Sequence, residues 1–257
     1  MRFDELKNKQ KVLSEKRIND LIALGKTQMF QNKIDESLRD IEMFLVLSKK
    51  PAISCGGGKD STASVVLVNQ VDPSIPIYCA NYVDPLPGRD EHIEKLKKVF
   101  PNKWNDVKYW WDIEAFLLGR LEYPAGLKMR LIDEAMKKDN VDGVIMGIRM
   151  KESMVRRITG YKKGSVYQIA DGSWRCCPVL RWTAEETLCL LLLFNIPIHP
   201  VYYQNLGVTN LEHLRDGTWN GMDFTDKYGY GEWLKYYHPE YYEKFKQGER
   251  RLETEDK

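Results

Sequence analysis

The chain has 257 residues, 43% of them hydrophobic and 30% charged, and this composition excludes an intrinsically disordered protein. Its length predicts one large domain, or one domain with appendages, that buries enough apolar surface to fold without disulfides. The 39 basic and 37 acidic residues leave a formal charge of only +2, which argues against a protein that coats nucleic acid but is compatible with a local basic groove.

The cysteines and the apolar runs indicate where the protein works. Its five cysteines lack the spacing of a disulfide framework, and the charged start MRFDELKNKQK lacks the pattern of a secretory leader. We therefore expect a cytoplasmic protein without disulfides. The longest apolar run, LCLLLLF at 188–194, is far shorter than the roughly 20 residues of a membrane span. It predicts a buried helix and no association with a membrane.

Taken in chain order, the sequence predicts helices first and then an alternation of strands and helices. Residues 5–48 have apolar side chains at helical spacing, which predicts two helices that end before Pro51. The strands expected after them are 52–55, 75–81, 107–111 and 141–147, and the helices start at residue 60 or span 89–100 and 126–139. Such alternation predicts an α/β fold, a mostly parallel open sheet with helices on both faces and ligands at the carboxyl ends of the strands.

Three segments are expected along the chain: an N-terminal helical extension at 1–33, an α/β domain at 34–203 that contains the glycine-rich motif described below, and an irregular C-terminal cap at 204–257. The cap is marked by composition, because eight of the 14 tyrosines lie between Tyr202 and Tyr242. These aromatic side chains either stack on a base or pack a small subdomain, and packing is the commoner role. Lys162 and Lys163 in an expected loop are only a weak footprint of nucleic-acid binding.

The motif GGGKDST at 56–62 stands between the first expected strand and the next helix. Bare glycines let main-chain N–H groups approach a ligand, and a lysine and hydroxyls at a helix N-terminus suit an anion. The simpler interpretation is a tight turn without a ligand, but the residues after the glycines favour phosphate, and the acid also offers a magnesium ligand. The candidate phosphate-binding residues are Gly56, Gly57, Gly58, Lys59, Asp60, Ser61 and Thr62.

A second polar segment, GIRMKESMVRR at 147–157, follows the last expected strand. Its guanidinium groups could hold phosphate or sulfate oxygens, although runs of this kind are often solvated ion pairs. Its place after a strand of the same sheet favours a ligand. The candidates are Gly147, Arg149, Glu152, Ser153 and Arg156. Asp84, after the second expected strand, is either a turn residue or a contact to the nucleotide or metal.

These motifs resemble a known family. GGGKDST resembles the PP-loop of the ATP pyrophosphatase (adenine nucleotide alpha hydrolase-like) superfamily, usually SGGKDS; Gly56 stands where that pattern has serine, and Ser54 either supplies the missing hydroxyl or does not. GIRMKESMVRR is similar to the G-x-R-x-x-E-S-x-x-R segment of the phosphoadenosine phosphosulfate (PAPS) reductase branch. The stretch 176–203 resembles that branch's series of proline, tryptophan, a helix, "IP" and tyrosine.

The resemblance implies an enzyme that binds Mg-ATP and transfers the adenylyl group to an acceptor with release of pyrophosphate. It implies Lys59, Asp60, Arg149 and Arg156 as catalytic residues, with Asp60 as a magnesium ligand. The reductases attack sulfur with a cysteine near the C-terminus, whereas this sequence has no cysteine after Cys189. We therefore expect adenylylation within sulfur transfer to nucleic acid, similar to phosphorothioation.

Two alternatives stay open. The first is a sulfate adenylyltransferase-like enzyme or a protein that binds PAPS or adenosine phosphosulfate in place of ATP. The second is a non-catalytic module that binds an adenine nucleotide. No iron–sulfur cluster is expected, because the adjacent Cys176 and Cys177 lack a partner pair of thiolates. Nucleic acid, a sulfur-donor protein and a second copy of the chain are the candidate partners.

Overall fold

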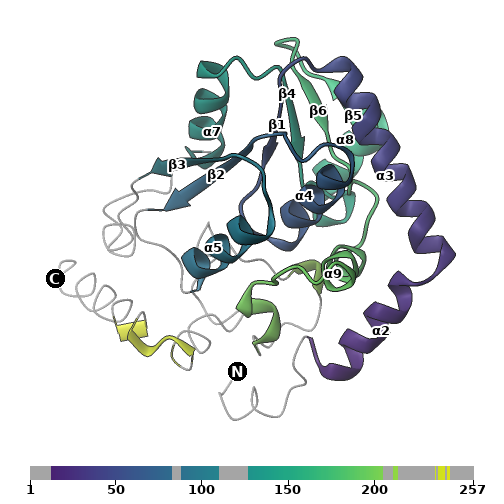
Figure 1. Ribbon diagram of the computed structural model, residues 1–257, viewed down its shortest axis with the longest axis vertical. Coiled ribbons are helices and arrows are strands. Elements are labelled where there is room, and N and C mark those ends of the chain that lie inside the picture. The colour runs from purple at the N-terminus through teal and green to yellow at the C-terminus, as the bar shows by residue number, and fades with distance from the viewer. Residues whose placement is uncertain are drawn as a thin grey trace.

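The computed structural model describes residues 13–82, 88–109, 127–204, 211–213, 235, 237–240 and 242–243. A six-stranded sheet with the order β3-β2-β1-β4-β6-β5 forms its centre (Figure 1). The strands are β1 (Pro51–Ser54), β2 (Ile77–Tyr82), β3 (Trp104–Tyr109), β4 (Gly143–Met146), β5 (Val166–Gln168) and β6 (Trp174–Cys176). All neighbouring strands are parallel except β5, which runs antiparallel to β6.

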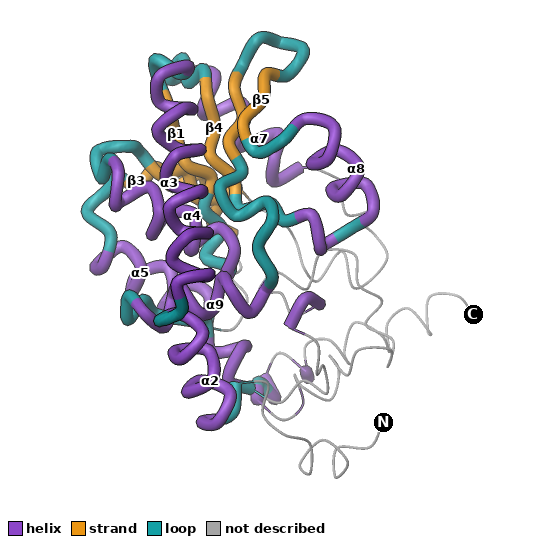
Figure 2. Tube along the Cα trace, turned by 90° about the vertical axis from the view of Figure 1, so that its right-hand side faces the viewer, coloured by secondary structure: helices purple, strands orange, loops and turns teal. Residues whose placement is uncertain are grey.

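Helices cover both faces of this sheet. They are α2 (Glu15–Gly25), α3 (Gln28–Leu47), α4 (Lys59–Val71), α5 (Arg89–Val99), α7 (Leu127–Lys138), α8 (Met154–Lys163) and α9 (Ala184–Leu193). Short 3₁₀ turns are η1 (Met150–Glu152), η2 (Pro200–Tyr203) and η3 (Leu211–His213). Figure 2 shows α3, α4, α5 and α9 on one side of the strands and α7 and α8 on the other. The predicted fold class is therefore confirmed.

The order of the strands determines where a ligand fits. The chain runs from β1 through β2 to β3 on one side of β1, and then returns through α7 to β4 on the other side. Right-handed crossovers place α4 and α5 on one face and α7 on the opposite face. In sheets of this kind the ligand-binding crevice lies at the carboxyl ends of the strands at such a reversal, here those of β1 and β4.

The hydrophobic core explains why the chain folds in this way. Ala52 and Ile53 of β1 are fully buried between the two helical layers, and Ile53 lies in register with Ile77 and Ile145 of its neighbours. The apolar run at 188–194 falls largely within α9, which packs between α2 and α4 as the buried helix that was predicted. A capping box starts α9, in which Thr183 and Glu186 satisfy each other's main-chain N–H groups.

The expected strands 52–55, 75–81 and 141–147 correspond to β1, β2 and β4 with ends shifted by up to two residues. β3 starts three residues earlier than expected, and β5 and β6 were not predicted at all, because three-residue strands carry no readable alternation. Among the described residues, no helix is long and apolar enough to cross a bilayer. The segment boundaries at 33 and 203 remain predictions, and most of the proposed cap lies outside the described residues.

Candidate nucleotide-binding site

The glycine turn connects β1 to α4 at the crevice. Gly58 is the N-cap residue of α4 and provides no side-chain cap, so main-chain N–H groups of the first turn face the crevice end of the helix. Gly57 has a φ of +86°, and a Cβ there would lie 2.8 Å from Cδ1 of Ile93. Nε2 of His92 lies 2.9 Å from the carbonyl oxygen of Gly57 and holds the turn from behind. The left-handed backbone at residue 57 therefore favours glycine, and bare main-chain N–H groups suit an anion cradle.

The lysine of the motif is buried rather than solvated. Lys59 is 3% exposed, and its Nζ lies 3.2 Å from Oδ2 of Asp60. Its main-chain N–H donates to the hydroxyl of Tyr202, whose ring centroid lies 5.8 Å from the ammonium group. A buried ammonium needs a compensating charge, and here the neighbouring carboxylate supplies it. The positive charge is therefore held at the N-terminus of α4, where it adds to the helix dipole.

The second predicted segment meets the first. A Cβ on Gly147, directly after β4, would lie 2.3 Å from the main-chain nitrogen of Ser61 and 2.5 Å from the carbonyl carbon of Asp60. The absence of a side chain at this residue thus allows the end of β4 to touch the first turn of α4. Two residues later, Nε of Arg149 donates to Oδ1 of Asp60 over 2.7 Å. The two motifs, about 90 residues apart in sequence, form one site.

Arg149 is the centre of this site. Its side chain is fully buried; Nε is bound to Asp60, Nη1 forms an ion pair with Glu212, and Nη2 has no hydrogen-bond partner among the described residues. Burial alone would lower the pKa of Arg149, but the carboxylates of Asp60 and Glu212 raise it overall, so the guanidinium stays charged. The oxygen Oε1 of Glu212 also accepts the N–H of Ala184 at the start of α9 over 2.8 Å.

The carboxylate of Asp60 lies between the guanidinium of Arg149 and the ammonium of Lys59 and contacts both. Oδ1 accepts from Arg149 and, over 3.1 Å, from the hydroxyl of Thr187, while Oδ2 faces the ammonium of Lys59. Magnesium needs oxygen ligands in octahedral geometry, and both oxygens of this carboxylate are already engaged by donors. The described residues also contain no group of three or more potential metal ligands. Asp60 therefore does not fit the predicted role of magnesium ligand in this arrangement.

The hydroxyl groups of the motif have different roles. Oγ of Ser61 donates to the carbonyl of Gly58 and accepts the N–H of Gly56, so it braces the turn. Oγ1 of Thr62 is buried without a hydrogen-bond partner among the described residues. Ser54 ends β1, half-buried, in register with Met146 of β4. Buried polar atoms cost free energy unless they are paired, so the hydroxyl of Thr62 and Nη2 of Arg149 are candidate donors for a bound anion.

The remaining predicted residues support Arg149. Oε2 of Glu152 accepts the main-chain N–H of Arg149 over 2.9 Å and forms an ion pair with Arg156. Ser153 is the N-cap of α8 and accepts the N–H of Arg156. The side chain of Arg156 is 38% exposed and that of its partner Glu152 only 9%, so this ion pair is partly solvated, whereas Arg149 is fully buried. Asp84 lies outside the described residues.

Sequence reasoning missed four residues of this site: Glu212, Thr187, Tyr202 and His92. All four approach from elements that are distant in sequence, and none belongs to a local pattern of charge or glycine. For Tyr202 a signal existed, because the tyrosine in the third resembling stretch could have been assigned to the site.

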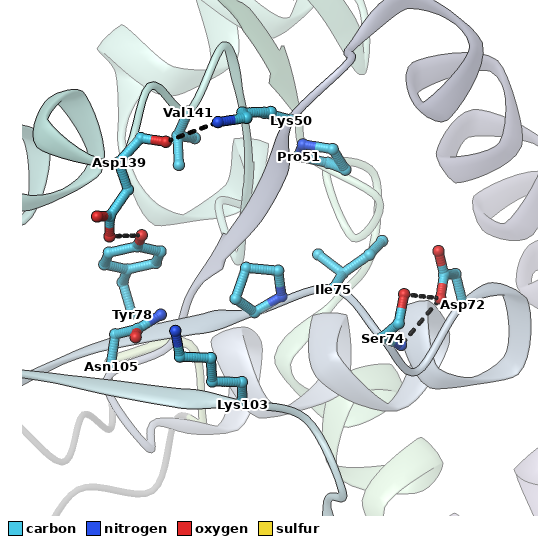
Figure 3. A pocket seen from close by; sticks show the side chains of 11 residues that line it. Lys50, Pro51, Asp72, Ser74, Ile75, Tyr78, Lys103, Asn105, Asp139 and Val141 are labelled. Carbon is cyan, nitrogen blue, oxygen red and sulfur yellow. Dashed lines mark hydrogen bonds between the residues drawn. The ribbon is translucent and has the colours of Figure 1, made fainter.

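A separate cavity lies away from the glycine turn. It has a volume of about 540 Å³ and lies at the amino ends of the strands, opposite the crevice (Figure 3). In it, the hydroxyl of Tyr78 donates to Asp139, and burial together with this carboxylate raises the pKa of Tyr78. The lining residues are Lys50, Pro51, Asp72, Ser74, Ile75, Pro76, Tyr78, Lys103, Asn105, Asp139 and Val141. Because α/β sheets bind ligands at the carboxyl ends of their strands, the glycine turn is the better candidate for a nucleotide site than this cavity.

Comparison with known proteins agrees with this architecture. Residues 50–238 match the family model of the phosphoadenosine phosphosulfate reductase domain. The chain is 25% identical over 208 residues to phosphoadenosine 5'-phosphosulfate reductase of Escherichia coli O1:K1 / APEC. The aligned region covers 76% of this chain and 83% of that protein.

In fold the chain is similar to Candida glabrata FMN adenylyltransferase, solved with FMN and the ATP analogue AMPCPP (TM-score 0.51, 16% identity, 72% of this chain and 66% of that one). The same enzyme with FAD and inorganic pyrophosphate is a similar match (TM-score 0.51, 14% identity, 72% and 66%). From the family match over most of its length, the three ordered motifs and the fold, the chain belongs to the phosphoadenosine phosphosulfate reductase family, within the PP-loop (adenine nucleotide alpha hydrolase-like) superfamily.

Proposed function

We propose that this protein binds Mg-ATP at the glycine turn and transfers its adenylyl group to an acceptor with release of pyrophosphate, in a cytoplasmic sulfur transfer to nucleic acid similar to phosphorothioation. One observation carries the proposal: Arg149 is buried against Asp60, at the point where β4 touches the N-terminus of α4. This junction brings the donors of Lys59 and Arg149 together with the main-chain N–H groups at the helix N-terminus, at the end of the sheet where a polyphosphate would bind.

In the proposed reaction an acceptor oxygen attacks the α-phosphorus of ATP, the bond from that phosphorus to the bridging oxygen of the β-phosphate breaks, and pyrophosphate leaves. The protein needs no nucleophile of its own, because such transfers depend on positioning and charge neutralisation. Lys59 and Nη2 of Arg149 would face the phosphoryl oxygens, and Thr62 would donate its hydroxyl. Magnesium bound to the phosphates would add further positive charge.

The described cysteines support adenylyl transfer over attack by a thiolate. All five cysteine side chains are buried. Burial raises the pKa of Cys177 and of Cys189 to about 12, and that of Cys176 well above its ordinary value. A thiol attacks sulfur as its thiolate, and thiols with such pKa values are protonated near neutral pH. We therefore assign none of these three thiols a role in the reaction.

Two other functions have specific support. The match to a PAPS reductase favours PAPS as the bound nucleotide, with the same cradle holding sulfonucleotide oxygens. A non-catalytic binding module is favoured by the neutralisation of Arg149, whose charge is already balanced by Asp60 and Glu212. The three functions differ in the nucleotide they bind and in whether pyrophosphate is released.

Calorimetry with ATP and with PAPS, beside a pyrophosphate assay without acceptor, with sulfate and with nucleic acid, separates these functions. We expect ATP binding and release of pyrophosphate that depends on nucleic acid. Release that depends on sulfate alone would refute the phosphorothioation-like role, and binding without release in any mixture would favour the module. Lys59→Ala is expected to abolish binding, whereas the matched control Lys103→Ala, in the cavity at the other end of the sheet, should bind normally.

A further inference from the structure

Helix α8 presents an unusually exposed surface next to the proposed site. It begins at Met154, directly after Ser153, and Figure 2 shows it on the outside of the molecule, away from α3 and α4. Tyr161 is 79% exposed, Val155 73%, Met154 64% and Ile158 50%. A surface helix normally turns such side chains toward the core. In α8 the buried face instead contains Gly160, which lies so close to Met150 that a Cβ would clash with its side chain.

The exposed side chains of α8 follow an ordered pattern around the helix. At about 100° per residue, Met154, Ile158 and Tyr161 form one stripe along the axis. Arg157 and Lys162 fall on the two sides of that stripe, and both are exposed. The outer face is therefore an apolar and aromatic strip between two cations, which we call the α8 face.

Charge distinguishes this region from the rest of the chain. Residues 151–163 contain five cations, Lys151, Arg156, Arg157, Lys162 and Lys163, and one acid, Glu152, for a local charge of +4. The whole chain has +2, so all other residues together sum to −2. The carboxylate of Glu152 is already engaged by Arg156 and by the N–H of Arg149. The electrostatic field of α8 therefore favours a polyanion.

We propose that the α8 face contacts single-stranded nucleic acid, with Arg157 and Lys162 on the phosphates and Tyr161 on a base. Cations that follow the backbone, together with exposed aromatic side chains, are how proteins hold single strands without reading their sequence. An unpaired strand fits better than a duplex because apolar side chains can reach base faces only where bases are unpaired. The inference rests on the proposed function, since it names the surface that presents the acceptor: α8 contains Arg156 and begins directly after Ser153.

The test is fluorescence anisotropy with a labelled oligothymidylate at several salt concentrations. The variant Arg157→Glu/Lys162→Glu is compared with Lys95→Glu/Lys98→Glu, an equal charge change on exposed lysines of α5 across the sheet. Each phosphate contact contributes a slope of about −0.7 to the dependence of log K on log salt for single strands. Between 50 and 200 mM salt the wild type should therefore lose roughly sevenfold more affinity than the α8 variant. Tyr161→Ala should weaken binding about tenfold with the salt slope unchanged.

Equal weakening by the α5 and α8 variants, or no oligonucleotide binding by the wild type, would overturn the proposal. So would preferential binding to vesicles of anionic phospholipid, or a dimer seen by sedimentation that Met154→Glu/Ile158→Glu dissociates, because the α8 face would then be a membrane or subunit contact. ATP binding, measured on the same variants by calorimetry, tests the nucleotide site independently. If the α8 variant loses oligonucleotide binding but binds ATP normally, the result supports the α8 face as the nucleic-acid contact. If the wild type does not bind ATP, the proposed function alone is refuted.

Discussion

Replacing Gly147 by alanine tests the contact on which the site depends. The new Cβ would lie 2.3 Å from the nitrogen and 2.5 Å from the Cα of Ser61, both main-chain atoms that no rotamer change can move. Ordinary contact needs about 3.5 Å, so β4 and α4 must separate by about 1 Å. Overpacking of this kind costs about 1–3 kcal/mol, which for a chain of this size lowers the Tm by about 2–12 °C.

The same displacement should weaken nucleotide binding. The hydrogen bond from Arg149 to Asp60 is 2.7 Å long and cannot stretch by about 1 Å and persist. A charge-assisted bond contributes about 1.5–3 kcal/mol, so we expect the Kd for ATP, measured by calorimetry, to rise at least about tenfold. Gly172→Ala is the control, because no atom lies within 4 Å of its Cβ while its φ of +86° still costs stability. The reasoning is refuted if Gly147→Ala binds ATP as tightly as Gly172→Ala does.

Three further outcomes are expected. Glu212→Gln keeps an acceptor for Arg149 but removes a negative charge near the phosphates, which should tighten ATP binding about fivefold; weaker binding in calorimetry would contradict this. Burial alone would raise the pKa of Asp142, but hydrogen bonds from Ser48 and the N–H groups of Lys50 and Lys49 lower it. The stability it adds is present above pH 3.8 and is lost as the pH falls through the lower folded-state pKa. The difference in Tm between wild type and Asp142→Asn should therefore shrink in acid. A difference that does not change with pH would contradict the stabilising role of these hydrogen bonds to Asp142. A thiol reagent should modify the five buried cysteines only at the rate of unfolding, and a fast phase in native buffer would disprove their burial.

The sequence predicts those parts of the fold that leave a local pattern. Short apolar runs located β1, β2 and β4, and the three glycines after β1 marked the turn. The expected start of β3 was three residues too late because Asn105 and Asp106 interrupt the alternation of apolar side chains. An edge strand tolerates such residues, since it pairs with only one neighbour. β5 and β6 are too short for periodicity and form only through pairing with each other and with β4.

For the candidate site, the sequence indicated which residues to consider but not which of them are buried or which partners they contact. Arg149 and Arg156 are equivalent by pattern, yet Arg149 is fully buried and paired with Asp60 and Glu212, whereas Arg156 is partly exposed and paired with Glu152. Glu212 lies 63 residues further along the chain than its partner Arg149, and its contact exists only after folding. The local pattern also did not show that both oxygens of Asp60 already have donors, because two of these donors, Arg149 after β4 and Thr187 in α9, are distant in sequence.

A crystal structure with a non-hydrolysable ATP analogue tests the central claim most directly. We predict that the polyphosphate contacts the main-chain nitrogens of the glycine turn and lies within hydrogen-bond distance of Nη2 of Arg149 and the hydroxyl of Thr62. An analogue seated instead in the cavity beside Lys103, with the glycine turn unchanged, would contradict the account.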